Sequence, residues 1–175
     1  MGWEDALGKL PVEKTEAQKE KRKKIFQEFD PNGNGYLSLA ECDLGCRNIL
    51  GLGDVLPKPV IMRAYQTARN VSQRDGKNPT QHGEDYIEQS EFRVFLVYLA
   101  RYLELWKTFS GMDDNNDRRV SFEEFEKSLD KLSEWGVSTN DPKKTFDEID
   151  GNSGGMILFD EFCQWALDKT KFELD

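Results

Sequence analysis

The sequence has few of the features that mark membrane-spanning or nucleic-acid-binding proteins. Its longest uncharged apolar run is the seven residues 94–100, whereas a membrane-spanning helix needs about 20. Lys and Arg number 24 against 33 Asp and Glu, which gives a net charge of -9. A nucleic-acid-binding protein needs positive charge over much of its surface. We therefore expect neither a transmembrane segment nor a nucleic-acid partner.

Histidine and cysteine are also scarce. The single histidine, His82, excludes a zinc site that needs two histidines and gives little support to a Ser-His-Asp triad. The three cysteines, Cys42, Cys46 and Cys163, are an odd number for a disulfide framework. They are most simply reduced thiols in a cytoplasmic protein, with Cys42 and Cys46 packed in the core. Without a catalytic set of residues, we expect that the protein is not an enzyme.

What the sequence does contain is a repeated twelve-residue pattern. The segment 30–41 has oxygen-bearing side chains at positions 1, 3, 5, 9 and 12, and Gly35 at position 6. Calcium takes six to eight oxygen ligands, and alternating loop positions point inward around it. Glycine at position 6 allows a sharp turn with positive φ. With the backbone carbonyl at position 7 included, the expected calcium ligands are Asp30, Asn32, Asn34, Tyr36, Ser38 and Glu41.

The pattern recurs twice in the C-terminal half. The loop 113–124 has three carboxylate ligands, but Arg118 stands where glycine is expected. In the loop 150–161, Gly154 and Leu158 supply no side-chain oxygen at positions 5 and 9, so water must fill both places. The expected ligands of these two loops are Asp113, Asn115, Asp117, Arg119, Ser121 and Glu124 in one, and Asp150, Asn152, Met156 and Glu161 in the other.

A degenerate copy lies between the first loop and these two. Aligning Ile87 and Glu91 with positions 8 and 12 starts it at Thr80, in place of the usual aspartate. We expect this copy to be a structural partner of the segment around the first loop rather than a calcium site. The longer spacing in front of it predicts an insertion at about 70–78, and the segment 74–79 is typical of a loop.

Apolar residues at helical spacing precede and follow each loop, which predicts a helix on either side. A lone helix–loop–helix hand exposes its apolar face, so we expect hands to pair, with Leu37 beside Ile87 and Val120 beside Ile157. The predicted fold class is all-α, with four EF-hand units in two lobes. The expected lobes are residues 1–101 and 102–175.

The chain resembles the EF-hand calcium-sensor superfamily and, more narrowly, the flagellar calcium-binding proteins of kinetoplastids, the calflagins. The segments that carry this resemblance are 15–30, 91–93, 134–150 and 159–162. The resemblance implies a calcium sensor at the flagellar membrane, anchored by acyl groups and basic residues, whose main calcium sites are the two C-terminal loops. Trp3 and Ala6 depart from the acylation pattern. Either this relative is not acylated, or its native N-terminus is missing from this chain.

Several interpretations remain open at this point. The leading one is a calcium sensor that exposes an apolar surface to an unidentified protein target. The alternatives are a calcium buffer and a calcium-modulated structural adaptor of the flagellar cytoskeleton, and the loops could also be polar turns that hold no ion. The basic run Lys19 to Lys24 is either a solvated helix face or a contact with an anionic membrane or an acidic partner.

Overall fold

The computed structural model describes residues 2–53, 55–74, 85–133, 140–172 and 174. The fold is all-α, as predicted, and the chain divides into two compact units, Met1–Leu103 and Glu104–Asp175. The elements of the first unit are α1 (Trp3–Gly8), α2 (Glu16–Phe29), β1 (Tyr36–Leu37), α3 (Leu39–Leu44), a π-helical turn (Gly45–Ile49), α4 (Lys58–Arg74) and β2 (Ile87–Glu88). The helix α5 (Gln89–Met112) begins in the first unit and ends in the second. The remaining elements are β3 (Arg119–Ser121), α6 (Phe122–Lys127), α7 (Leu129–Ser133), α8 (Pro142–Ile149), β4 (Met156–Leu158) and α9 (Phe159–Thr170).

A candidate ligand, Asp30, directly follows the packed helix α2. Thr15 caps its N-terminus, because the Thr15 side chain accepts a hydrogen bond from the Gln18 N–H at 3.4 Å. Its buried face includes Phe26 and Phe29, which are 4% and 2% exposed. The helix ends at Phe29, so Asp30, position 1 of the first loop, directly follows a buried residue.

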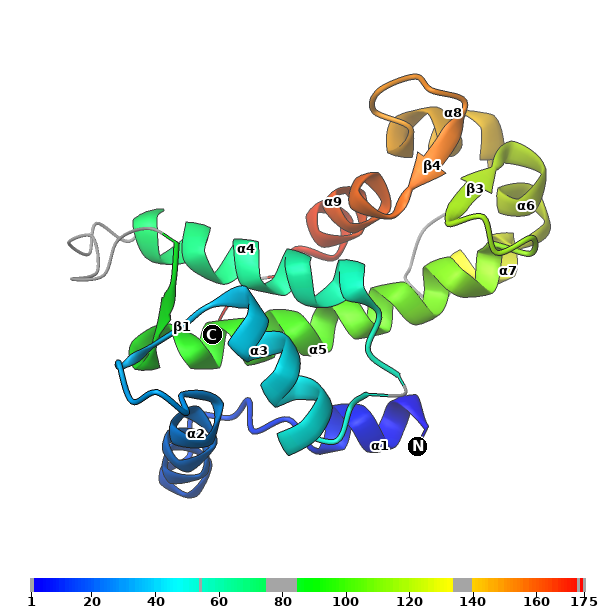
Figure 1. Ribbon diagram of the computed structural model, residues 1–175. Helices are drawn as coiled ribbons and strands as arrows, with labels where there is room; N and C mark the ends of the chain where they lie inside the picture. Colours follow the sequence, from blue (N-terminus) through cyan, green and yellow to red (C-terminus); the bar gives the residue numbers. More distant parts are fainter. Residues whose placement is uncertain (1, 54, 75–84, 134–139, 173, 175) are drawn as a thin grey trace. The chain divides into compact units, whose positions relative to one another are not determined.

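Each unit contains one short antiparallel strand pair that joins two loops (Figure 1). In the first unit, Tyr36 pairs with Glu88 and Leu37 with Ile87. In the second unit, the pairs are Arg119 with Leu158, Val120 with Ile157, and Ser121 with Met156. The predicted contacts of Leu37 with Ile87 and of Val120 with Ile157 are therefore confirmed, and all four side chains are buried.

Phenylalanine rings from the flanks of the loops form much of the core. In the first unit, the Phe92 ring lies edge-on to Phe26 and Phe29, with centroids 5.5 and 5.3 Å apart. In the second unit, the Phe109 centroid lies 5.4 Å from that of Phe159. The flanking phenylalanines that are at most 6% exposed are Phe26, Phe29, Phe92, Phe95, Phe109, Phe125, Phe146, Phe159 and Phe162. This aromatic surface is closed to solvent.

The cysteines are part of the same interior. Cys42, Cys46 and Cys163 are free and buried, and the expectation that Cys42 and Cys46 pack in the core is confirmed. Burial raises the pKa of both the Cys42 and the Cys46 thiol. The thiolate is the reactive form of cysteine, so these two thiols stay protonated and unreactive.

Two helices bear on points that the sequence predicted differently or left open. The helix α4 continues to Arg74, so the first residue of the segment expected to form a loop is still helical; residues 75–79 lie outside the described residues. The helix α5 is continuous over 24 residues, although its sequence also permitted a break near Ala100. In the described part of the chain, every helix is too short or too polar to cross a bilayer.

Candidate metal sites

The first loop is organised by the side chains at positions 1, 3 and 5. The Asp30 carboxylate accepts the Asn34 N–H at 3.1 Å and the Gly35 N–H at 2.8 Å. The Asn32 Oδ1 atom also accepts the Asn34 N–H, at 2.9 Å, and the Asn34 Oδ1 atom accepts the Tyr36 N–H at 3.1 Å. These bonds tie the side chains at positions 1, 3 and 5 to the backbone N–H groups at positions 5 to 7.

The glutamate at position 12 closes the first loop. Glu41 accepts hydrogen bonds from the Ser38 N–H at 2.9 Å and the Ser38 hydroxyl at 2.8 Å, while Ser38 caps the Glu41 N–H. This reciprocal pair is a capping box that starts α3. The other Glu41 oxygen accepts the Asn32 side-chain N–H at 2.7 Å. Glu41 therefore links the outgoing helix to the beginning of the loop.

The loop 113–124 repeats this arrangement. The Asp113 carboxylate accepts the Asp117 N–H at 3.2 Å and the Arg118 N–H at 2.9 Å. The Asn115 Oδ1 atom accepts the Asp117 N–H at 2.8 Å, and the Asp117 carboxylate accepts the Arg119 N–H at 2.9 Å. Positions 1, 3 and 5 thus make the same contacts as in the first loop.

Glu124 closes this loop as Glu41 closes the first. It accepts the Ser121 N–H at 2.9 Å and hydroxyl at 2.8 Å, and it reaches back to the N–H groups of Asp114 and Asn115 at 3.2 and 3.4 Å. Burial raises the pKa of the Glu124 carboxyl, but the hydrogen bonds from Ser121, Asn115 and Asp114 outweigh burial and lower the pKa below its usual value. Glu124 is therefore held as the carboxylate that a cation requires.

In the loop 150–161, the residues at positions 1 and 12 make hydrogen bonds like those of their counterparts in the other two loops. Asp150 accepts the Gly154 N–H at 3.0 Å and the Gly155 N–H at 2.8 Å. Glu161 accepts the Asn152 N–H at 3.1 Å and the Leu158 N–H at 2.9 Å. Leu158 has no side-chain oxygen, so only the glutamate half of the capping box forms.

Positive φ angles recur at two positions of each of these loops. At position 6, φ is 85° at Gly35, 67° at Arg118 and 79° at Gly155, so the expected turn is confirmed even where arginine replaces glycine. At position 4, φ is 67° at Gly33, 58° at Asn116 and 56° at Ser153. Sequence reasoning missed position 4, although glycine and asparagine, which tolerate this conformation, occupy it in two of the three loops.

The donors gathered in these loops are mixed rather than purely acidic. Among the described residues, no three side chains of the His, Cys, Asp and Glu types converge into a metal cluster. The loops instead combine carboxylates with amides, hydroxyls and the strand-starting residues Tyr36, Arg119 and Met156, which are the expected backbone ligands. A carboxylate has about four lone-pair sites, so the N–H groups bound to Asp30, Asp113 and Asp150 leave capacity for an ion.

The degenerate loop retains its second half. Glu91 accepts the Glu88 N–H at 2.9 Å, as the glutamates of the other loops accept the N–H at position 9. Thr80, His82 and Glu84, which would occupy positions 1, 3 and 5, lie outside the described residues.

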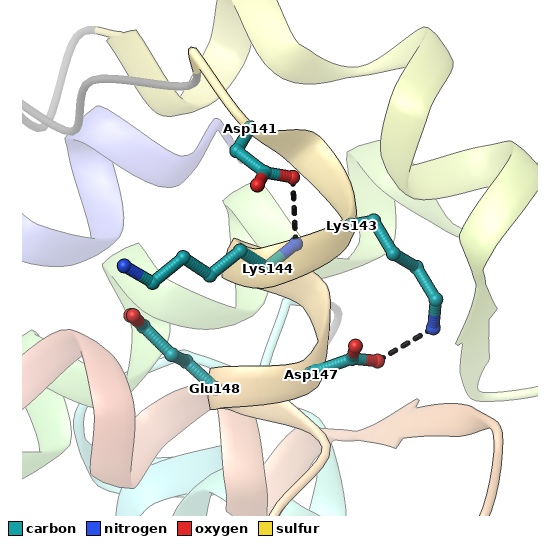
Figure 2. A pocket seen from close by; sticks show the side chains of 5 residues that line it. All are labelled: Asp141, Lys143, Lys144, Asp147 and Glu148. Atoms are coloured by element: carbon teal, nitrogen blue, oxygen red, sulfur yellow. Dashed lines mark hydrogen bonds and ion pairs between the residues drawn. The ribbon is translucent and has the colours of Figure 1, made fainter.

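Two surface pockets differ in their charge. The pocket in Figure 2, about 480 Å³, is lined by α8 and its cap, where Lys143 pairs with Asp147 at 2.5 Å and Asp141 accepts the Lys144 N–H at 3.1 Å. Its lining combines two lysines with three carboxylates, and such a mixture of both signs is typical of a solvated helix face. The second pocket, about 440 Å³, has four cations and no carboxylate in its described lining. Its charged lining residues are Lys19, Arg22, Lys23 and Arg93.

Comparison with known proteins identifies the family. The sequence model of the FCaBP EF-hand domain matches residues 7–99. The flagellar calcium-binding protein of Trypanosoma cruzi is 34% identical over 166 residues, which cover 94% of this chain and 77% of that protein. The flagellar calcium-binding protein TB-24 of Trypanosoma brucei brucei is 36% identical over 172 residues, 97% of this chain and 77% of that protein. The resemblance inferred from the sequence is thus confirmed, and the chain belongs to the FCaBP EF-hand family.

Proposed function

We propose that this protein binds calcium ions in the loops 30–41, 113–124 and 150–161. The observation that carries the proposal is the shared framework, in which a position-1 aspartate organises the loop and a position-12 glutamate links it to the outgoing helix. The all-oxygen donor set fits calcium, a hard cation with flexible coordination. The residues that would hold the ions are the sixteen predicted from the sequence: Asp30, Asn32, Asn34, Tyr36, Ser38, Glu41, Asp113, Asn115, Asp117, Arg119, Ser121, Glu124, Asp150, Asn152, Met156 and Glu161.

Isothermal titration calorimetry with single glutamate variants tests these sites. Glu41→Gln, Glu124→Gln and Glu161→Gln each remove the bidentate carboxylate of one loop, so each variant should bind one calcium ion fewer than the wild-type protein. Glu123→Gln is the matched control, because Glu123 is the exposed neighbour of Glu124 and pairs with Lys127 at the surface. If a loop variant and the wild-type protein bind the same number of ions, that loop holds no calcium.

We further propose a non-enzymatic sensor with two lobes, residues 1–101 and 102–175, which opens in response to calcium. The buried phenylalanines of the loop flanks support this role, because each lies on a helix that carries a position-12 glutamate or precedes a position-1 aspartate. Calcium sensors of this fold change the angle between paired helices and uncover an apolar groove. A rise in the fluorescence of an apolar dye with calcium is the expected sign of opening.

The relatives are named flagellar proteins, and we propose a flagellar location with contact to an anionic membrane surface. The supporting observation is the basic pocket, where Lys19 and Lys23 lie on α2 beside Arg93 of α5. Each Lys or Arg near an anionic surface contributes about 1 kcal/mol to binding. This attraction would act in addition to any lipid anchor.

Sedimentation with vesicles tests this contact. Lys19→Glu/Lys23→Glu should weaken binding to phosphatidylserine-containing vesicles at least about tenfold by the same rule, and neutral vesicles should bind neither protein. Lys143→Glu/Lys144→Glu is the control, because it makes the same change of charge on α8. Equal losses in the two double variants would indicate a response to net charge and contradict a specific contact.

A further inference from the structure

A hydroxyl group from α4 joins the first loop to the degenerate loop. Tyr65 is 3% exposed, and its Oη atom lies 2.9 Å from the Leu37 carbonyl oxygen and 2.7 Å from the Asp85 carbonyl oxygen. Leu37 belongs to β1 of the first hand, and Asp85 falls at position 6 of the degenerate loop when Ile87 is placed at position 8. The single hydroxyl proton is therefore shared between carbonyl oxygens of both loops, beside the β1–β2 pair.

Arg69, one helical turn further along α4, supports the same point. Its guanidinium lies 5.9 Å from the centroid of the Tyr65 ring, and its Nη2 atom lies 3.0 Å from the Asp85 carboxylate. Residues of α4 consequently contact both the backbone carbonyl and the side-chain carboxylate of Asp85. These contacts fix the second half of the degenerate loop through protein groups, without requiring an ion there.

The strand pairs of the two units differ in length, and the Tyr65 contact lies at the shorter one. The strand pair of the second unit has three residue pairs, whereas that of the first unit has two. The Tyr65 hydroxyl adds a further tie where the shorter pair ends. Burial raises the pKa of Tyr65, so its hydroxyl keeps the proton that it donates.

We propose that Tyr65 is a positioning residue for calcium binding at the loop 30–41. The inference rests on the proposed calcium site in that loop and deepens it. Tyr36, directly before Leu37, is the expected backbone ligand of that site, so a restraint on the Leu37 carbonyl limits the movement of its neighbour. A loop that is ordered before the ion arrives loses less conformational entropy on binding, and its affinity is higher.

The test is the variant Tyr65→Phe, which removes the hydroxyl but keeps the ring that Arg69 faces. An NMR calcium titration that follows the Gly35 amide reports on the first loop alone, because Gly35 donates to Asp30 inside that loop. We expect calcium affinity there to fall about three- to tenfold, the effect of one lost hydrogen bond. Affinity at the loops 113–124 and 150–161 should stay unchanged.

Tyr102→Phe is the matched control. Tyr102 is also a buried tyrosine of the first unit, and its hydroxyl lies 2.9 Å from the Thr67 hydroxyl, which links α5 to α4. Its loss should leave the Gly35 titration unchanged. In the calcium-free protein, amide hydrogen exchange at Leu37 and Ile87 should be faster in Tyr65→Phe than in Tyr102→Phe.

The outcomes separate this inference from the proposed function. If wild-type protein binds calcium in the first loop and Tyr65→Phe binds it equally well, the positioning role is overturned and the site stands. If both tyrosine variants weaken binding equally, general loss of stability explains the effect, and the positioning role is again overturned. If the Gly35 amide of wild-type protein does not respond to calcium, the proposed site and the inference both fall.

Discussion

Arg118 is a residue whose side-chain type conflicts with its backbone conformation. Its φ angle is 67°, a conformation that costs a residue with a Cβ atom about 1–2 kcal/mol. The arginine side chain also places a positive charge beside the loop proposed to bind a cation. The Arg118 N–H nevertheless donates to Asp113 at 2.9 Å, so the loop keeps the hydrogen bond that glycine makes at the equivalent position of the first loop.

Replacing Arg118 by glycine should therefore tighten calcium binding at the loop 113–124 by a few-fold. The relief of strain, about 1–2 kcal/mol, exceeds the entropy cost of ordering the more flexible glycine-containing loop, about 0.5–1 kcal/mol, and removal of the charge acts in the same direction. Calorimetry at low salt, where charges are least screened, measures the change. The control Arg119→Ala removes the neighbouring charge without relieving a positive φ angle. If Arg118→Gly binds no more tightly than wild-type protein, either the turn is not strained or the loop holds no calcium.

Strain at a positive φ angle can also be tested at Ser153, by measuring the free energy of unfolding. Its φ angle is 56°, and that of Asn116 at the equivalent position is 58°. Asparagine adopts this conformation more readily than serine. In calcium-free protein, Ser153→Gly should raise the free energy of unfolding by about 0.5–1 kcal/mol, the strain relieved less the entropy cost, whereas Asn116→Gly should change it little. Thermal unfolding followed by circular dichroism compares the two, and an equal gain in both variants would contradict the assignment of strain to Ser153.

At the scale of helices and strands, the features predicted correctly are those that local spacing determines. The pairing of Leu37 with Ile87 followed from position 8 of the repeat, and the capping box of Ser38 and Glu41 involves two predicted ligands three residues apart. The short helix α1 and the π-helical turn at Gly45–Ile49 were not predicted. Neither has a repeat or an apolar period to indicate it.

The sequence pattern could not predict hydrogen bonds between residues that are distant in sequence. The Tyr65 hydroxyl reaches Leu37 across 28 residues of sequence, and the buried Arg22 donates to the carbonyl oxygens of Pro11 and Glu13 at 2.9 and 2.5 Å. In the sequence, Arg22 is part of a basic run typical of a solvated face, but it is only 9% exposed. Burial and the neighbouring Arg93 lower the pKa of Arg22. Such partners become visible only when the helices are packed.

The packing of Gly45 against the Phe29 ring is another tertiary contact that the sequence pattern does not reveal. A Cβ atom there would lie 2.5 Å from the Phe29 ring, which is fully buried. Gly45→Ala should therefore force Phe29 to move and lower the free energy of unfolding of the first unit by about 1–3 kcal/mol, the usual cost of overpacking. Gly53→Ala is the control, because a Cβ atom there would make only ordinary contacts, at 3.7 Å or more. Denaturant unfolding in the absence of calcium should separate the two variants, and equal stability would contradict close packing at Gly45.

At the scale of the whole molecule, the described structure has its phenylalanine-rich surfaces closed within each unit. Phe92 and Phe95 in the first unit, and Phe109, Phe125 and Phe162 in the second, are at most 1% exposed. A calcium sensor must uncover such surface when its loops fill, whereas a calcium buffer fills its loops with little opening. The two functions therefore predict the same number of bound ions and opposite behaviour of the core.

The most direct test of the sensor proposal is a calcium titration of the full chain with an apolar fluorescent dye, run beside calorimetry on the same sample. We predict that dye fluorescence rises in step with calcium occupancy, that a chelator reverses the rise, and that magnesium at the same concentration does not reproduce it. The variant carrying Glu41→Gln, Glu124→Gln and Glu161→Gln together should show no rise. Loops that fill with calcium while the dye signal stays flat would contradict a sensor and identify the protein as a buffer.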